Sequence, residues 1–392
     1  MKTVCICILS FISISFCSQC PAGVWTDLAA EQYVQANGSD IVAGTYSVPS
    51  FVDFNSDGLK DLVVGEKQSY PSIVGKVRVY LNSGTESEPE FSSYYYIQSG
   101  GSDLEVVAQS CMGCFPRVVQ WDSDGKKDLI VGLSNGAYDG SVMLYLNVGT
   151  DEAPVFDSGR LIEYGPAGSK TPINVGIRAT PAICDFNSDS KKDLLIGNFD
   201  GSLEVYINEG TDTEPNFITS YFVQDNGENL FVDTYRASPT VADLNNDGKK
   251  DILTGDSVGQ MRVYTNVGTD QNPTFSGYYL VEAGGAVIDL PSYSPTIYAR
   301  SRPFLCDWTN DGYIDVLVGS SDGKISLFEG LPYQADTEPD GDVDMDDFIV
   351  LSRWWMQADC SSSQDCCGAD MNTDGIVDVN DLEIFSEEWI LP

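Results

Sequence analysis

The sequence predicts an all-β five-bladed β-propeller followed by a small α-helical domain built on two acidic loops. Three observations lead to this prediction. A nine-residue motif rich in Asp occurs five times, and its copies begin 58 to 67 residues apart. Two strand patterns follow every copy, one an apolar run and the other alternating. The segment that would complete the fifth unit stands at the N-terminus.

Each unit of about 60 residues contains four short strand patterns, which is the size and content of one propeller blade. Strand A precedes the motif, strands B and C follow it, and strand D begins at a Pro-x-Phe sequence. The fifth unit stops after strand C at Gly330, whereas residues 25–42 resemble the D segment at residues 91–106. The N-terminal strand is therefore expected to close the ring over residues 19–332 and to leave no open sheet edge. An open array of hairpins is the alternative.

The motif forms a loop between strands A and B and carries side-chain oxygens at alternating positions. In the first copy they belong to Asp53, Asn55, Asp57 and Asp61, around a glycine turn, and the Leu59 carbonyl adds another donor. Hard oxygens around a sharp turn favour Ca²⁺, whereas Mg²⁺ prefers octahedra rich in water. Repetition of the loop in every unit favours calcium over a metal-free Asx-rich turn.

The other four copies are expected to use the equivalent positions, with the residue after the turn contributing its carbonyl. These positions are Asp122, Asp124, Lys126 and Asp128; Asp185, Asn187, Asp189, Lys191 and Asp193; Asp243, Asn245, Asp247, Lys249 and Asp251; and Asp307, Thr309, Asp311, Tyr313 and Asp315. Gln120 replaces the leading Asp of the second copy, Ser190 replaces the turn glycine of the third, and Thr309 is a poor ligand in the fifth. The first and fourth copies are therefore expected to bind calcium most tightly and the second to bind it weakly.

These motifs resemble the FG-GAP or VCBS repeats of calcium-bearing β-propellers, and the resemblance covers residues 19–332. It implies the fold and about five propeller calcium sites. It leaves the function open, because such propellers serve as adhesion modules, lectin-like binders and some polysaccharide lyases.

Residues 333–392 contain two loops with the ligand spacing of an EF-hand, ending in Asp rather than Glu, and each loop precedes a short helix with one apolar face. The expected ligands are Asp336, Glu338, Asp340, Asp342, Asp344 and Asp347 in the first loop, and Asp370, Asn372, Asp374, Ile376, Asp378 and Asp381 in the second. The tandem resembles a type I dockerin, which implies two further calcium sites and calcium-dependent docking to a cohesin-like partner on a scaffold or cell surface. The family's recognition positions correspond to Met345, Asp346, Val379 and Asn380. A self-contained calcium-stapled cap is the alternative.

Composition removes several classes of function. Acidic residues number 59 against 21 basic ones, and the formal net charge of −38 argues against nucleic-acid binding. The chain has 0 histidines, which removes His-dependent nucleophiles, His-ligated zinc and histidine general bases. Nearly every clustered carboxylate belongs to a predicted calcium loop, so no catalytic pair can be nominated and a binding protein is favoured over an enzyme.

The N-terminus is typical of a secretory signal peptide, predicted over residues 1–18. Lys2 precedes an apolar run at residues 4–16 that is too short to span a membrane. No later run is apolar enough to do so, and we expect a secreted or cell-surface protein; a lipoprotein anchored through Cys17 is less favoured. In an oxidising compartment, the remaining cysteines are expected to form a local staple between Cys111 and Cys114 and one bridge near the C-terminus.

Arginines gather just before strand A in a chain that is otherwise strongly acidic. Five of them do so: Arg117, Arg178, Arg236, Arg300 and Arg302. Arg178, Arg236 and Arg300 each lie seven residues before a motif, so they are expected at equivalent places on the face opposite the calcium loops. Guanidinium groups suit carboxylate or sulfate, and with Tyr70 and Tyr138 they predict a site for an acidic glycan. The alternative is that these arginines bond backbone carbonyls of neighbouring blades.

The leading hypothesis is therefore an exported calcium-binding propeller that recognises glycan or cell-surface material and is tethered through its C-terminal region. The alternatives are a polysaccharide-degrading lyase or glycoside hydrolase of a secreted complex, and a structural surface protein.

Overall fold

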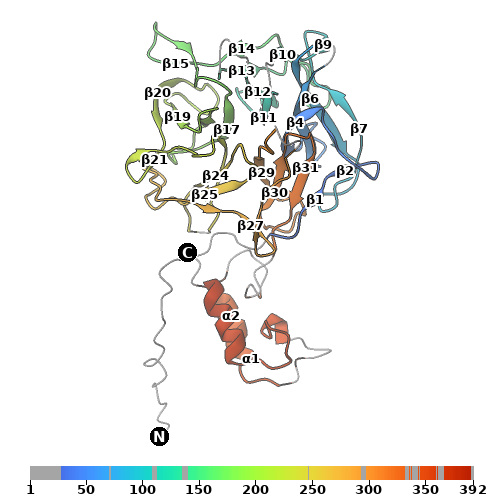
Figure 1. Cartoon of the computed structure of the whole chain (residues 1–392), viewed down its shortest axis with the longest axis vertical. Helices are drawn as coiled ribbons and strands as arrows, with labels where there is room; N and C mark the ends of the chain where they lie inside the picture. Colours follow the sequence, from blue (N-terminus) through green and yellow to red (C-terminus); the bar gives the residue numbers. More distant parts are fainter. Residues whose placement is uncertain are drawn as a thin grey trace.

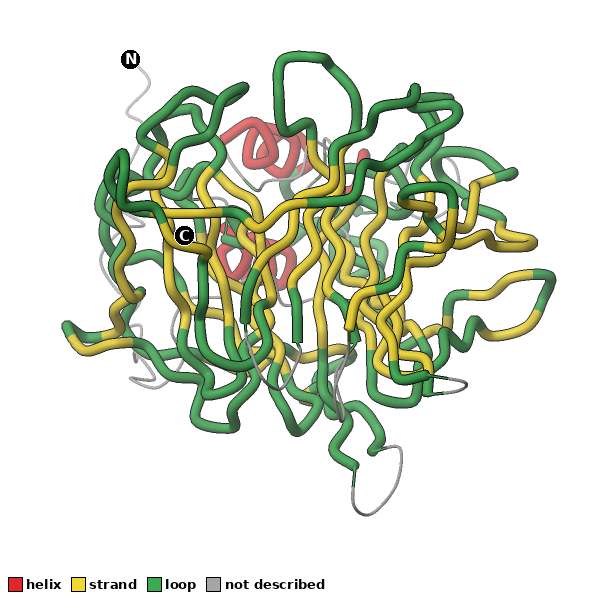
Figure 2. The backbone as a smooth tube through the Cα atoms, turned by 90° about the horizontal axis from the view of Figure 1, so that it is seen from above, coloured by secondary structure: helices red, strands yellow, loops and turns green. Residues whose placement is uncertain are grey.

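Five blades, each built on four antiparallel strands, surround a common centre in the computed structural model, so the predicted five-bladed propeller is confirmed (Figure 1). The structure describes residues 28–69, 72–107, 113–134, 140–245, 247–292, 297–331, 335, 337, 343, 345–358, 360 and 366–389. From the side, the strands run between two faces made of loops (Figure 2). The Asp-rich loops that join strands A and B lie on one face, and the D–A and B–C connections lie on the other.

Within every blade the strands follow one another from the centre outward in the order A, B, C and D. Blade 1 consists of β4 (Thr45–Val52), β5 (Asp61–Gln68), β6 (Val74–Asn82) and β7 (Phe91–Tyr96). Blade 2 consists of β11 (Phe115–Val119), β12 (Asp128–Gly132), β13 (Val142–Tyr145) and β14 (Arg160–Leu161). Blade 3 consists of β17 (Thr180–Cys184), β18 (Asp193–Gly197), β19 (Leu203–Asn208) and β20 (Phe217–Phe222).

The last two blades repeat this order, but the fifth borrows its outer strand. Blade 4 consists of β23 (Ser238–Ala242), β24 (Asp251–Gly255), β25 (Met261–Tyr264) and β26 (Tyr279–Leu280). Blade 5 consists of β29 (Arg302–Cys306), β30 (Asp315–Gly319), β31 (Ile325–Phe328) and the N-terminal β1 (Gln32–Tyr33). In antiparallel register, Gln32 pairs with Leu327 and Tyr33 with Ser326, so the N-terminal strand closes the ring as predicted.

A short hairpin follows strand D in each blade and holds the neighbouring blade. The hairpins are β2 (Gln35–Ala36) with β3 (Ser39–Asp40), β8 (Gln98–Ser99) with β9 (Ser102–Asp103), β15 (Glu163–Tyr164) with β16 (Thr171–Pro172), β21 (Gln224–Asp225) with β22 (Glu228–Asn229), and β27 (Glu282–Ala283) with β28 (Ala286–Val287). The first four form a parallel bridge to the Phe of the next Pro-x-Phe sequence: Phe91, Phe156, Phe217 and Phe275. After its hairpin, blade 1 continues into β10 (Val106–Val107), which pairs with β6.

The apolar core lies between the sheets rather than in one central mass. Each of five buried clusters combines strands B and C of one blade with those of the next, as when Val63 and Val77 of blade 1 pack with Leu129 and Val131 of blade 2. The glycine that ends strand B allows this approach. A Cβ at Gly132 would lie 2.2 Å from the Ala179 carbonyl oxygen of the next blade, which no side chain tolerates.

The described C-terminal region contains two α-helices, one 3₁₀ helix and one disulfide bridge. Helix α1 covers Met345–Trp354, the 3₁₀ helix η1 covers Cys366–Gly368, and α2 covers Val379–Trp389. Phe348 and Phe385 pack with their ring centroids 5.5 Å apart, while Trp355 lies beyond the end of α1 and is exposed. The Cys360–Cys366 disulfide fulfils the expectation of one bridge there. The expected staple between Cys111 and Cys114 is wrong, since Cys114 is a free buried thiol; Cys111 itself lies outside the described residues. Within the described residues, no helix is long and apolar enough to span a membrane.

Candidate functional site

The Asp-rich loops fold around their own carboxylates, as the first copy shows. Asp53 accepts hydrogen bonds from the Asp57 and Gly58 amides at 3.2 and 3.1 Å. Asn55 accepts from the Asp57 amide at 3.1 Å, and Asp57 accepts from the Leu59 amide at 2.8 Å. The left-handed Gly58, with φ of 93°, permits the turn that brings these side chains together. The loop is therefore preorganised with its oxygens on the inside.

The last Asp of the motif has a second role that the sequence did not reveal. In all five copies it is buried and accepts at least two backbone hydrogen bonds, one from the second residue of its own loop and one from the last residue of strand C or the second residue beyond it. In blade 4, Asp251 accepts from the Leu244 amide at 3.1 Å and from the Asn266 amide at 2.8 Å. Burial raises the pKa of Asp193, Asp251 and Asp315 to about 6. These carboxylates connect the loop to strand C through hydrogen bonds that do not depend on a metal ion.

The donor set of the third loop fits a hard divalent cation. In the third loop, carboxylate oxygens of Asp185, Asp189 and Asp193 all lie within 4.8 Å of one another. That is the arrangement of carboxylate oxygens that Ca²⁺ ligation requires. Lysines partly neutralise the loops, since ammonium groups lie 2.9, 3.2 and 2.7 Å from Asp124, Asp189 and Asp247, respectively.

The degenerate copies differ in the way their sequences suggest. Gln120 donates its side-chain amide to the Gly125 carbonyl at 3.2 Å, where Asp53 of the first copy accepts hydrogen bonds instead. Ser190 takes the left-handed conformation of the turn glycine, with φ of 65°, at a steric cost that Gly avoids. In the fifth copy the Thr309 hydroxyl oxygen is buried and has no hydrogen-bond partner in the described part of the chain.

The second C-terminal loop repeats the turn at the start of the propeller loop. Asp370 accepts from the Asp374 and Gly375 amides at 3.1 and 2.8 Å, and Gly375 has a φ of 92°. The closing Asp381 is buried, as is Asp347 at the same position of the first loop. The other predicted ligands of the first loop, Asp336, Glu338, Asp340, Asp342 and Asp344, lie outside the described residues. The recognition positions Met345, Val379 and Asn380 are exposed at the starts of α1 and α2.

The predicted arginines come together at the inner ends of the blades as a channel arginine cluster, which we define as Arg178, Arg236, Arg300 and Arg302. Arg178 and Arg302 stack on the Phe115 ring at 4.8 and 5.8 Å, and Arg300 and Arg302 on the Tyr46 ring at 4.7 and 5.4 Å. Arg178 also donates to the Ala237 carbonyl at 3.1 Å and to the Ser238 hydroxyl at 2.7 Å, across the blade boundary. The expected alternative, bonding to neighbouring backbone, therefore holds for Arg178.

Charge in this cluster is poorly compensated. Arg178 and Arg302 are 1% and 2% exposed, and neither forms an ion pair with any described residue. Burial, followed by repulsion from neighbouring arginines, lowers the pKa of both groups well below the usual arginine value. Arg117 lies apart: it bonds the Ser50 hydroxyl at 3.3 Å and stacks on Phe304, and burial lowers its pKa to about 10.

The backbone that presents the cluster is strained at repeated positions. The residue seven before the motif has a left-handed φ in four blades: Tyr46 at 60°, Arg178 at 66°, Arg236 at 63° and Arg300 at 62°. Such conformations are costly for residues with a Cβ and tend to persist at functional sites. Tyr70 and Tyr138, the aromatic residues predicted beside the arginines, lie outside the described residues.

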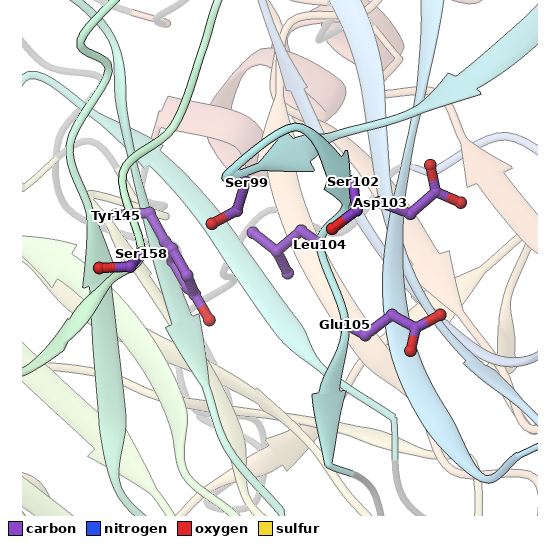
Figure 3. A pocket seen from close by; sticks show the side chains of 7 residues that line it. All are labelled: Ser99, Ser102, Asp103, Leu104, Glu105, Tyr145 and Ser158. Carbon is purple, nitrogen blue, oxygen red and sulfur yellow. The ribbon is translucent and has the colours of Figure 1, made fainter.

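A cavity that the sequence analysis missed lies between blades 1 and 2, with a volume of about 550 Å³. Its wall consists of Ser99, Ser102, Asp103, Leu104, Glu105, Tyr145 and Ser158 (Figure 3). The β8–β9 hairpin supplies one side, and strand C with the following turn of blade 2 supplies the other. Lys76 of blade 1 forms ion pairs with Asp103 and Glu105 at 3.0 and 3.1 Å.

Residues 185–254, which span the third and fourth motifs, match the family model described as FG-GAP-like repeat. This match supports an FG-GAP-type propeller. The sequence has no significant match among curated proteins.

Several solved structures resemble the fold at low identity. A GH43_1 enzyme from Xanthomonas citri is 13% identical, with a TM-score of 0.45, over 76% of this chain and 89% of that one. CoXyl43, a GH43 beta-xylosidase/alpha-arabinofuranosidase from a compost microbial metagenome, is 11% identical, with a TM-score of 0.47, over 78% and 97%. The alpha-L-arabinofuranosidase PaAbf62A from Podospora anserina is 13% identical, with a TM-score of 0.42, over 78% and 96%. Similarities this low assign no activity to this chain.

Proposed function

We propose that this protein is a calcium-stapled recognition module, exported to the cell surface or beyond, whose propeller binds an anionic ligand at the channel arginine cluster. The observation that carries the proposal is the burial of Arg178 and Arg302 without an ion-pair partner among the described residues. Burying a charge is costly unless a counter-charge or hydrogen bonds compensate it. In a chain with a net charge of −38, a buried cluster of uncompensated positive charge favours a ligand that brings the missing negative charge.

The hydrogen bonds within the cluster leave two guanidinium N–H groups without an acceptor. The Nε atoms of Arg178 and Arg302 are buried and have no hydrogen-bond partner in the described part of the chain. A guanidinium group presents five donors in a fixed fork, which matches carboxylate and sulfate oxygens. Carboxylated or sulfated glycans carry these groups, and they are the ligand class that we propose.

Replacing the two buried arginines tests this proposal. We expect the Arg178→Met/Arg302→Met variant to fold with a melting temperature equal to or above that of the wild type in anion-free buffer, because mutual repulsion is relieved. The Ala237 carbonyl keeps a partner in the variant, since the Thr180 hydroxyl also donates to it at 2.7 Å. Low-millimolar citrate or hexagalacturonate should raise the melting temperature of the wild type but not of the variant, as measured by scanning fluorimetry.

The exposed Arg160 supplies the control, since Arg160→Met removes the same charge from the surface of β14 and should leave the anion response intact. An anion response that survives in the double variant would show that the ligand binds elsewhere. A double variant that loses several kcal/mol of stability, in a protein without an anion response, would show that the arginines only clamp the blades.

Calcium would be held in the propeller by the side-chain oxygens of the five loops and in the C-terminal region by those of the two EF-hand-like loops. The convergence of Asp185, Asp189 and Asp193 supports this assignment. When bound, the ion neutralises carboxylates that otherwise repel one another. Asp53 and its equivalents then hold the A–B connection in one conformation on the face opposite the arginines.

For the C-terminal region we propose calcium-dependent docking to a cohesin-like partner, and we expect calcium to order it. Arg353 is the only trypsin site in residues 333–392, and it lies within α1. Without calcium, repulsion among the loop carboxylates should unfold α1 and allow cleavage at Arg353, whereas millimolar calcium should slow cleavage at least tenfold. Mass spectrometry of the full chain during digestion measures both rates. Equal rates with EDTA and with calcium would favour a calcium-independent cap.

A further inference from the structure

Tyr145 differs from three tyrosines that occupy the same place in other blades. Tyr80, Tyr145, Tyr206 and Tyr264 all pair, in strand C, with the first apolar residue of strand B. The other three lie against a second tyrosine ring, with centroid distances of 5.3 Å for Tyr80, 5.1 Å for Tyr206 and 5.5 Å for Tyr264. In blades 1 and 4 the covering tyrosine lies three residues after the phenylalanine of the Pro-x-Phe sequence. In blade 2 the residue at this position is Gly159.

Gly159 packs directly against the Tyr145 ring and has no side chain that could cover it. Any Cβ at Gly159 would lie 2.5 Å from Cε1 of Tyr145, so glycine is required beside the ring. Tyr145 is 5% exposed, and its hydroxyl points into the cavity between blades 1 and 2 (Figure 3). No described residue accepts a hydrogen bond from this hydroxyl, which is open to the cavity that it lines. Burial raises the pKa of Tyr145 to about 12, so the phenol remains a donor at neutral pH.

A second cavity adjoins the first at Asp103. It has a volume of about 540 Å³, and its wall includes Tyr95, Gln98 and Glu152. Tyr95 is 40% exposed, so part of its ring is available to a ligand. We name the two cavities together the blade 1–2 groove. Their volumes fall within the usual range for small-molecule sites, which is about 300–1,000 Å³.

The chemistry of the blade 1–2 groove selects against anions. Three carboxylates, those of Asp103, Glu105 and Glu152, line the groove, and one ammonium group, that of Lys76, pairs with the first two. Lys76 already bridges Asp103 and Glu105, which reduces the attraction of the groove for a second cation. The remaining wall offers the hydroxyl groups of Ser102 and Ser158, the Ser99 hydroxyl as an acceptor, an amide and aromatic surface. A ligand that carries alternating hydroxyl groups and apolar C–H faces would complement such a wall.

We propose that the blade 1–2 groove binds a neutral oligosaccharide. The Tyr145 hydroxyl donates to a sugar oxygen in the first cavity, and Asp103 accepts from sugar hydroxyls in both. Tyr95 packs against a ring face in the second cavity. This site goes beyond the proposed anion site, because it differs in location, in charge and in the residues that form it.

Calorimetric titration of the full chain in calcium tests the proposal, with cellohexaose, xylohexaose and mannohexaose as probes. We expect one of them to bind with a stoichiometry of one. Tyr145→Phe should weaken this binding about tenfold, since it removes one hydrogen bond that is made only in the complex. The matched control is Tyr264→Phe, which removes the equivalent hydroxyl from blade 4 and should change the affinity less than twofold.

A second pair of variants tests the neighbouring cavity. Tyr95→Ala should weaken binding, whereas Tyr221→Ala should not, because Tyr221 has the equivalent place in blade 3 and a similar exposure of 44%. Failure of all three neutral hexasaccharides to bind at millimolar concentration would overturn the proposal. So would equal losses in Tyr145→Phe and Tyr264→Phe, or binding of spermidine in place of the sugars. Loss of sugar binding in Arg178→Met/Arg302→Met would also place the sugar outside the groove.

Discussion

Removing calcium should lower the melting temperature of the propeller by roughly 15 °C or more. A ligand that binds only the folded state adds about 2.7 kcal/mol per site at a hundredfold excess over Kd. Three good sites would then supply about 8 kcal/mol, which is comparable to the whole stability of many domains. Differential scanning calorimetry in calcium and in EDTA measures the difference. A melting curve indifferent to EDTA would show that the loops are not calcium sites.

The increase in melting temperature on calcium binding should depend on which loop is changed. We expect Asp53→Ala and Asp243→Ala to reduce it most and Asp122→Ala to reduce it least, because the second loop already lacks its leading carboxylate. Asp53 also accepts hydrogen bonds within its loop, so each variant must be compared with and without calcium. The opposite order of losses would contradict the assignment of these loops.

The increase in melting temperature on calcium binding should also become larger as the pH rises. In EDTA, the pKa of Asp193, Asp251 and Asp315 lies at about 6 in the folded protein, above the value of about 4 for an exposed carboxyl. A raised folded-state pKa contributes stability at low pH that is lost as the pH rises through about 6. The metal-free melting temperature should therefore fall between pH 5 and pH 7, and calcium should recover more of it at pH 7.

Asp251→Ala should cost about 3 kcal/mol even without calcium. The substitution leaves two buried amides, those of Leu244 and Asn266, without acceptors, and each orphaned donor costs about 1–3 kcal/mol. Asp247→Ala is the matched control, because Asp247 belongs to the same loop but accepts only local hydrogen bonds. Urea denaturation in EDTA measures both losses. Equal losses would mean that Asp251 has no structural role apart from the metal.

The sequence predicts the blades well because each depends on local repetition. The five motifs, the strand patterns and the N-terminal segment all determine which strands pair, and the structure has those pairs. The hairpins after strand D are harder to predict, because their two-residue strands carry little pattern of their own. Their contact with the next Pro-x-Phe phenylalanine, as at Ala36 and Phe91, becomes evident only in three dimensions.

The candidate sites divide in the same way. Loop ligands two residues apart can be predicted from spacing, as at Asp53 and Asp57. The burial of Arg178 depends on how closely neighbouring blades approach, which composition does not state. The sequence does mark the blade 1–2 groove, because Gly159 stands where blades 1 and 4 have a tyrosine. That difference predicts a cavity only once the structure shows that those tyrosines cover the ring equivalent to Tyr145.

The closing strand has a consequence for how the molecule assembles. Strand β1 leaves the ribosome first, yet its partner β31 is made after every other strand of the ring. The chain must therefore hold one end unpaired until synthesis of the propeller is nearly complete, and pairing of such distant segments is slow. A chain truncated before residue 325 would expose the outer edge of an incomplete last blade, a template for aggregation. The ring can therefore close only after both ends of the propeller have been synthesised.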